Sequence, residues 1–115
     1  MSTHTIDTVN NALNDKLLAL EEMRARLAAA ENTQALTAAM CDDAKAALDA
    51  INRVSPRDPL ASIRAFAAYR ASSAVAVSAF FERDCISEAE RKLVDDIAIL
   101  NVEIAHLTQQ PFYSS

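Results

Sequence analysis

Glycine is absent from this sequence of 115 residues, and aromatic residues make up only 5% of it. Average usage predicts about eight glycines in a chain of this length. Phosphate-binding loops, dinucleotide fingerprints and nucleophile elbows all need glycine where the backbone turns at positive φ or approaches a ligand closely. Tight β-hairpins favour glycine as well, and strands favour aromatic residues. The two shortages exclude those motifs and predict an all-α fold.

Basic residues are also scarce, with 11 lysines and arginines against 16 acidic residues and a net charge of −5. This balance argues against binding to nucleic-acid phosphates or anionic membranes, so we expect a protein partner, with a basic surface as one option. The least charged stretch, residues 65–81, contains Arg70 and is too short for a membrane span. The first residues lack the basic and apolar segments of a signal peptide, which predicts a cytoplasmic protein.

The two cysteines, Cys41 and Cys85, have neither the CxxC nor the Cys/His spacing of a zinc site. The expected helices separate them by roughly 12 Å along the axis, so we expect reduced thiols and no disulfide. No pattern of serine, histidine or carboxylate residues indicates a catalytic site. We therefore predict no enzymatic activity and no cofactor.

The spacing of apolar residues predicts amphipathic helices. The first, at about 6–31, carries apolar residues three and four positions apart. The next large apolar residues, Leu36 and Met40, are about half a turn out of phase with that pattern. The phase change predicts a turn at 31–33, made by Asn32 and capped by Thr33, and a second helix at about 33–54. A single helix of about fifty residues stays open as the alternative.

Proline and capping residues predict the later boundaries. Pro56 and Pro59 end the second helix, and Asp58 followed by Pro59 is typical of a helix start. Ser87 and Glu90 form a capping-box sequence, which predicts another start near residue 88.

The predicted architecture is an antiparallel up-down-up-down four-helix bundle, because short connections make neighbouring helices antiparallel. We expect a single domain over residues 1–115, with loose termini at 1–5 and 111–115. The four predicted helices span about 6–31, 33–54, 59–82 and 88–109.

Arg70 occupies a core-type position in the predicted third helix. Because a buried charge needs a partner, we predict a register pair between Arg70 and Asp43, with Asp95 or Asp96 as other acceptors. Two further interpretations stay open. The side chain reaches solvent, or it binds a carboxylate of a partner protein.

A second apolar band runs along the predicted third helix beside several small residues. A surface helix needs one apolar face, so two bands indicate either a wide core face or a surface for another chain. We favour an interface, most simply that of a two-fold homodimer. The predicted interface residues are Phe66, Tyr69, Arg70, Ser73, Ala76 and Phe80.

Metal binding has weak support in the sequence. Glu103 and His106 form one Glu-x-x-His pair, whereas di-metal bundles use two. His4 and Asp7 are expected at the same end of the bundle. Two solvated histidines explain the pattern more simply, so we predict no metal site and keep a ferritin-like metal-binding bundle as an alternative.

Together, these features predict a non-enzymatic protein-binding module. Small size, acidity and the lack of catalytic motifs fit a bacterial or phage-encoded inhibitor of a toxin or a host defence complex. The alternative is a self-associating structural or assembly-chaperone bundle whose third helix makes the contact.

Overall fold

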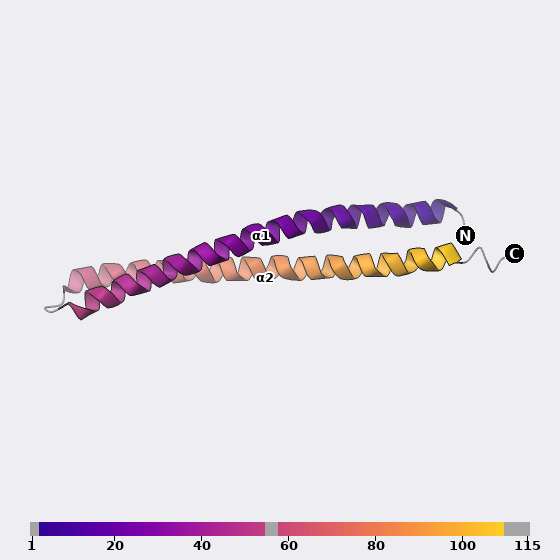
Figure 1. Ribbon diagram of the computed structural model, residues 1–115. Helices are drawn as coiled ribbons and strands as arrows, with labels where there is room; N and C mark the ends of the chain where they lie inside the picture. Colours follow the sequence, from indigo (N-terminus) through magenta and orange to yellow (C-terminus); the bar gives the residue numbers. More distant parts are fainter. Residues whose placement is uncertain (1–2, 55–57, 110–115) are drawn as a thin grey trace. The chain divides into compact units, whose positions relative to one another are not determined.

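A computed structural model describes residues 3–54 and 58–109 of the chain. It contains α1 at Thr3–Arg53 and α2 at Pro59–Gln109, each a single helix of 51 residues (Figure 1). The predicted all-α class is confirmed, but the predicted four-helix bundle is wrong, since two helices replace the four. The loose terminus expected at 111–115 lies outside the described residues. Thr3 to Thr5, which are part of the loose terminus expected at 1–5, belong to α1.

A strict heptad repeat explains why α1 is one helix. Two series of residues, one starting at Ile6 and one at Val9, each have a spacing of seven residues along α1. The two series contain fourteen residues, and none of them is exposed. They form one line along the helix, which we call the seam, because their spacing alternates between three and four residues. The seam residues of α1 are Ile6, Val9, Leu13, Lys16, Leu20, Met23, Leu27, Ala30, Gln34, Thr37, Cys41, Ala44, Leu48 and Ile51.

The predicted turn at 31–33 is wrong, and the single-helix alternative is correct. The seam passes through small and polar residues, whereas Leu36 and Met40, which suggested the phase change, are 67% and 61% exposed. The Thr33 hydroxyl donates a hydrogen bond to the Ala29 carbonyl oxygen at 3.1 Å. This bond to the preceding turn is typical of a threonine inside a helix. Thr33 therefore caps no new helix.

The same repeat continues through α2. Ser87 and Glu90 lie inside this helix, so the predicted helix start near residue 88 is wrong. Glu90 is itself a partly buried seam residue, and Glu88 accepts a surface hydrogen bond from Arg91 Nη1 at 2.8 Å. The seam residues of α2 are Ser62, Ala65, Tyr69, Ser72, Ala76, Ala79, Arg83, Ile86, Glu90, Leu93, Ile97, Leu100, Ile104 and Leu107.

The predicted start of a helix at Asp58 and Pro59 is confirmed. The backbone N–H groups of Leu60 and Ala61 donate to Asp58 Oδ1 at 3.0 and 3.3 Å. This side chain satisfies two of the donors that a helix leaves unpaired at its first turn. Pro59 has no N–H to leave unpaired, which suits the first helical position. Pro56 lies outside the described residues.

The contacts of the chain define two units, which we describe separately. Unit 1 comprises Met1–Arg26 and Ile86–Ser115. Its α1 and α2 segments run antiparallel, because Lys16 Nζ lies 3.5 Å from Asp96 Oδ2 while Ala12, earlier in α1, lines the same pocket as Leu100, later in α2. Its seam is mostly leucine and isoleucine.

Unit 2 comprises Leu27–Cys85 and contains the connection between the helices. Its segments are also antiparallel, since Asn52 near the end of α1 accepts a 2.7 Å hydrogen bond from Ser62 Oγ near the start of α2. The single domain expected from chain length stays a prediction, because a division by contacts does not test whether either unit folds alone.

The chain leaves more of its surface in contact with solvent than a compact monomer of its mass would. Its accessible surface is 8276 Å², whereas a compact monomer of 12.5 kDa would expose roughly 6,200 Å². No described side chain is fully buried. The hydrophobic residues with the lowest exposure are Val9, Leu20, Ala79, Ile86 and Leu107. About 2,000 Å² more surface than expected thus stays in contact with solvent.

Candidate functional site

The seam of unit 2 consists mainly of small and polar residues. Ala30, Thr37 and Ala44 occupy three of its α1 positions, and Ser72 and Ala76 two of its α2 positions. Thr37 is buried, and its hydroxyl donates within its own helix to the carbonyl oxygens of residues 33 and 34, at 2.9 and 3.0 Å. Since each such residue buries little apolar area, this seam contributes less to stability than one of leucine and isoleucine would.

Large apolar side chains lie instead on the surface of unit 2. Of the fifteen that are exposed within residues 3–54 and 58–109, ten belong to unit 2. The ten are Leu36, Met40, Val54, Leu60, Ile63, Phe66, Val75, Val77, Phe80 and Phe81. Unit 2 therefore exposes most of its large apolar side chains, while small and polar residues fill much of its seam.

Part of this exposed set forms a continuous line on α2, which we call the α2 stripe. Each member directly follows a seam residue, so the stripe has the same three-and-four spacing and lies beside the seam. Ile63 is 65% exposed, Phe66 50%, Val77 51% and Phe80 46%. The α2 stripe comprises Ile63, Phe66, Arg70, Ser73, Val77 and Phe80.

The aromatic residues of the α2 stripe make local contacts along the helix. The Arg70 guanidinium lies 5.9 Å from the centre of the Phe66 ring, within the range of a cation–π interaction. The rings of Phe80 and its neighbour Phe81 are 5.9 Å apart in an edge-to-face arrangement. Both contacts join residues close in sequence, so the outer faces of these side chains stay exposed.

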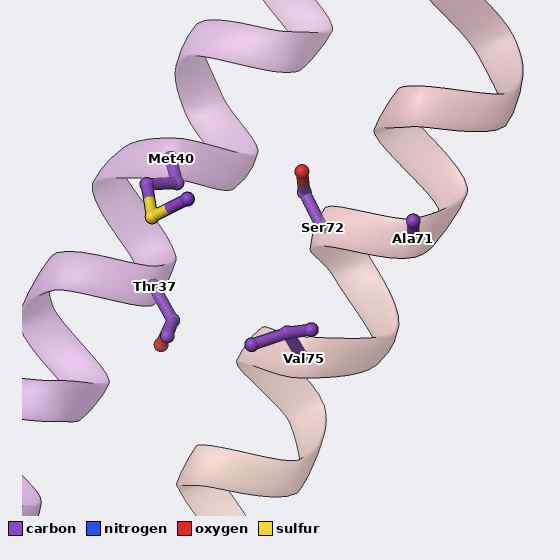
Figure 2. A pocket seen from close by; sticks show the side chains of 5 residues that line it. All are labelled: Thr37, Met40, Ala71, Ser72 and Val75. Atoms are coloured by element: carbon purple, nitrogen blue, oxygen red, sulfur yellow. The ribbon is translucent and has the colours of Figure 1, made fainter.

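A small pocket of about 160 Å³ lies in unit 2 where the seam residues are smallest. Figure 2 shows Thr37 and Met40 on α1 across from Ser72 and Val75 on α2, with Ala71 beside them. Sites for drug-sized ligands start at roughly 300 Å³, so this space suits a single side chain rather than a substrate.

Unit 1 has a shallower pocket beside the Lys16–Asp96 ion pair, which Ile99 and Leu100 also line. The two charged side chains are 43% and 30% exposed. Partly exposed pairs of this kind contribute about 0–1 kcal/mol, because water screens them. Their main effect is to place a lysine at a seam position without burying its charge.

The predicted interface residues divide into two groups. Phe66, Arg70 and Phe80 are exposed and Ser73 is partly exposed, all on the α2 stripe. Tyr69 and Ala76 are partly buried seam residues. Ile63 and Val77 also belong to the α2 stripe but were not among the predicted interface residues. The unbroken heptad from Ile6 was the available signal, because continuing it assigns both residues to the surface.

The expected register pair is not brought together. Arg70 and Asp43 are both exposed, and no ion pair joins them in the described part of the chain. Asp96 pairs with Lys16 instead, and Asp95 is exposed.

The weak metal candidates and the cysteines make no site. Asp7, Glu103 and His106 are exposed, and the side chain of His4 lies outside the described residues. Within the described residues no group of three histidine, cysteine or acidic residues is placed to hold a metal ion. Cys41 and Cys85 are unpaired thiols, the first partly buried in the seam and the second exposed.

Comparisons with known proteins add no family assignment. No family model, no curated protein and no solved structure matches this chain. Over the residues described, neither α1 nor α2 contains a stretch long and apolar enough to cross a membrane.

Proposed function

We propose that this chain is a non-enzymatic protein-binding module that acts through the α2 stripe. The observation that carries the proposal is the inverted arrangement of unit 2, with small residues in the seam and large apolar residues on the surface. In a protein without a binding partner, exposing phenylalanine and isoleucine while burying alanine and serine gives up stabilisation that burial of the larger apolar side chains would provide. Contiguous exposed apolar residues are typical of interaction surfaces.

The spacing of the α2 stripe indicates the kind of partner. Residues three and four positions apart form a ridge that fits the groove of another helix, as in coiled coils and helix-in-groove recognition. Ser73, between the larger Phe66 and Phe80, leaves room for a side chain of the partner. A helical protein segment is therefore the ligand that this surface suits best.

The charge balance of the chain indicates the kind of partner surface that it suits. Sixteen acidic residues against eleven basic ones suit a partner with basic surface around an apolar centre. An inhibitor of a bacterial toxin or host defence complex, encoded by a bacterium or phage, is a class that fits this balance. Two unpaired cysteines suit a reducing compartment such as the cytoplasm.

A self-associating structural protein or assembly chaperone is the second candidate function. It uses the same α2 stripe, and the observation that favours it is that Arg70 and Asp84, of opposite charge and both exposed, lie seven residues before and after Val77. The two candidates differ in whether the bound helix belongs to another protein or to a second copy.

Site-specific photocrosslinking tests the proposed function. The photoreactive residue p-benzoylphenylalanine replaces Val77 in one variant and Val102 in the control, both exposed valines of α2. Only Val77 belongs to the α2 stripe. We expect covalent protein adducts from cells expressing the Val77 variant and few from cells expressing the Val102 variant. Mass spectrometry identifies the protein in each adduct, whichever protein it is. Equal adduct yields at both positions would contradict the proposal.

A further inference from the structure

We propose that the α2 stripe binds a second copy of this chain, with the two α2 segments antiparallel about a two-fold axis at Val77. This inference rests on the proposed function, because it names the occupant of the same surface. Three observations carry it: the placement of charges, the placement of large and small residues, and the amount of exposed surface.

Charge complementarity fixes the register of the two copies. Arg70 and Asp84 lie seven residues before and after Val77 and on the same line of the helix. A two-fold axis at Val77 therefore places Arg70 of one copy opposite Asp84 of the partner subunit, twice per dimer. Both residues are exposed, and the structure gives neither an ion pair within the described residues.

Close to the axis, the sizes of the residues match in the same register, whereas Phe66 and Ile63 lie opposite Glu88 and Arg91 of the partner subunit. The two-fold axis at Val77 brings Ser73 and Ala74 opposite the phenylalanines at positions 80 and 81 of the partner subunit. Large side chains then pack onto small ones, which is how the ridges of one helix enter the grooves of another. The edge-to-face contact of Phe80 with Phe81 orients this pair on its own helix before the copies meet.

A competing register would be centred at Ser72. It would bring Ile63 opposite Phe81, but it would place the two Arg70 side chains only about 6 Å apart along the axis. No acidic residue would face them, since residues 70–78 of the partner subunit, which lie opposite, contain none. Bringing two like charges out of water without partners is strongly unfavourable, so the register at Val77 is preferred.

Exposed apolar side chains supply part of the area that a stable dimer buries. A standard interface removes about 800 Å² from each partner. Phe66, Phe80 and Phe81 are each about half exposed and offer roughly 100 Å² apiece.

Charge reversal tests the pairing. Sedimentation equilibrium gives the dimer Kd of the full chain and of R70E, D84R and the double variant R70E/D84R. Each single variant should weaken the dimer about 30-fold or more, and the double variant should return to within about threefold of the parent, because the swapped charges attract again. Circular dichroism confirms that each variant keeps its helix, which is expected since both side chains are exposed.

Cysteine crosslinking tests the register independently of the charges. In a C41A/C85S background, V77C should form a disulfide-linked dimer on mild oxidation, because the two-fold axis brings its Cβ atoms together. I63C is the matched control on the same stripe, since its two copies would be about 42 Å apart along the axis. S73C should fail as well, at about 12 Å.

The outcomes separate this inference from the proposed function. A chain that stays monomeric at high concentration overturns the inference, and it leaves the proposed function standing if the photoreactive residue at position 77 captures a different protein. The stated register is overturned if the dimer Kd is unchanged in the R70E variant. It is also overturned if S73C forms the disulfide-linked dimer and V77C does not. A monomer without adducts at position 77 contradicts both proposals.

Discussion

Arg83 is the seam residue whose polar group is least well satisfied. Its Nε atom is buried and has no hydrogen-bond partner among the described residues. The α2 seam residues one step before and after it are Ala79 and Ile86, which offer no polar side-chain atoms. An unsatisfied buried donor costs about 1–3 kcal/mol, so this position weakens unit 2.

Arg83→Met should therefore raise the free energy of unfolding by about 1 kcal/mol, because methionine keeps much of the length and removes the unsatisfied donor. Urea titration followed by circular dichroism measures this change. The matched control is Arg64→Met, an exposed arginine of the same helix, which should change stability by less than about 0.5 kcal/mol. A loss of stability in Arg83→Met would show that the guanidinium makes a favourable interaction.

Single residues of the candidate site were only partly predictable from the sequence. Two apolar bands exceed what one helix face needs, and Phe66 and Phe80 of the second band are exposed. Arg70, whose spacing predicted a core-type position, is exposed as well. That these residues form an interface stays a prediction. Tyr69 and Ala76 were assigned to the same surface but belong to the seam. The sequence did not separate these two from the exposed residues, because residue size was used to locate the core, whereas unit 2 exposes most of its large apolar side chains.

At the scale of the helices, periodicity determined more than local capping signals. Ser87 and Glu90 match a capping box, yet the helix passes through them. A capping sequence stabilises a helix only at a terminus, where backbone groups lack partners within the helix. With an unbroken seam, interrupting the helix costs more free energy than continuing it, since each helical residue adds a hydrogen bond. Asp58 caps a real start because proline follows it.

Alanine substitutions distinguish real caps from apparent ones. Asp58→Ala should lower the free energy of unfolding by about 1 kcal/mol, because the first turn of α2 loses its acceptor. Thr33→Ala and Ser87→Ala should be neutral or stabilising by a few tenths of a kcal/mol, because both positions are inside helices and alanine has the higher helix propensity. Thermal or urea unfolding measures all three.

The opposite ranking would restore the four-helix interpretation. If Thr33→Ala and Ser87→Ala each lost about as much stability as Asp58→Ala, turns at residues 31–33 and 83–87 would have to exist in solution.

At the scale of the whole molecule, the two units differ in what fills their seams. The α2 seam of unit 1 includes Ile97, Leu100 and Leu107, whereas that of unit 2 includes Ala65, Ser72 and other small residues. Burying a leucine contributes about 1.5–3 kcal/mol more than leaving it exposed, and alanine contributes far less. The units should therefore open at different free energies.

Hydrogen exchange should reveal this difference. In dilute protein, amides of residues 86–107 should exchange at least about tenfold more slowly than those of residues 62–83. Raising the protein concentration should slow exchange in residues 62–83 and leave residues 93–107 nearly unchanged, because a two-fold axis at Val77 brings residues 63–91 of the two copies together. Uniform protection at every concentration would contradict both the stability difference and the dimer.

The sequence by itself determined the all-α class, the start of α2 at Asp58 and the presence of a surplus apolar band. These follow from backbone chemistry and local spacing, since missing glycine, a capping aspartate and residues three and four apart act within one or two turns. Tertiary structure decided the length of the helices and which band faces the other helix. That choice depends on the heptad line that stays continuous over 51 residues, because only a continuous line can remain in contact with a second helix, even where its residues are alanine, serine and threonine.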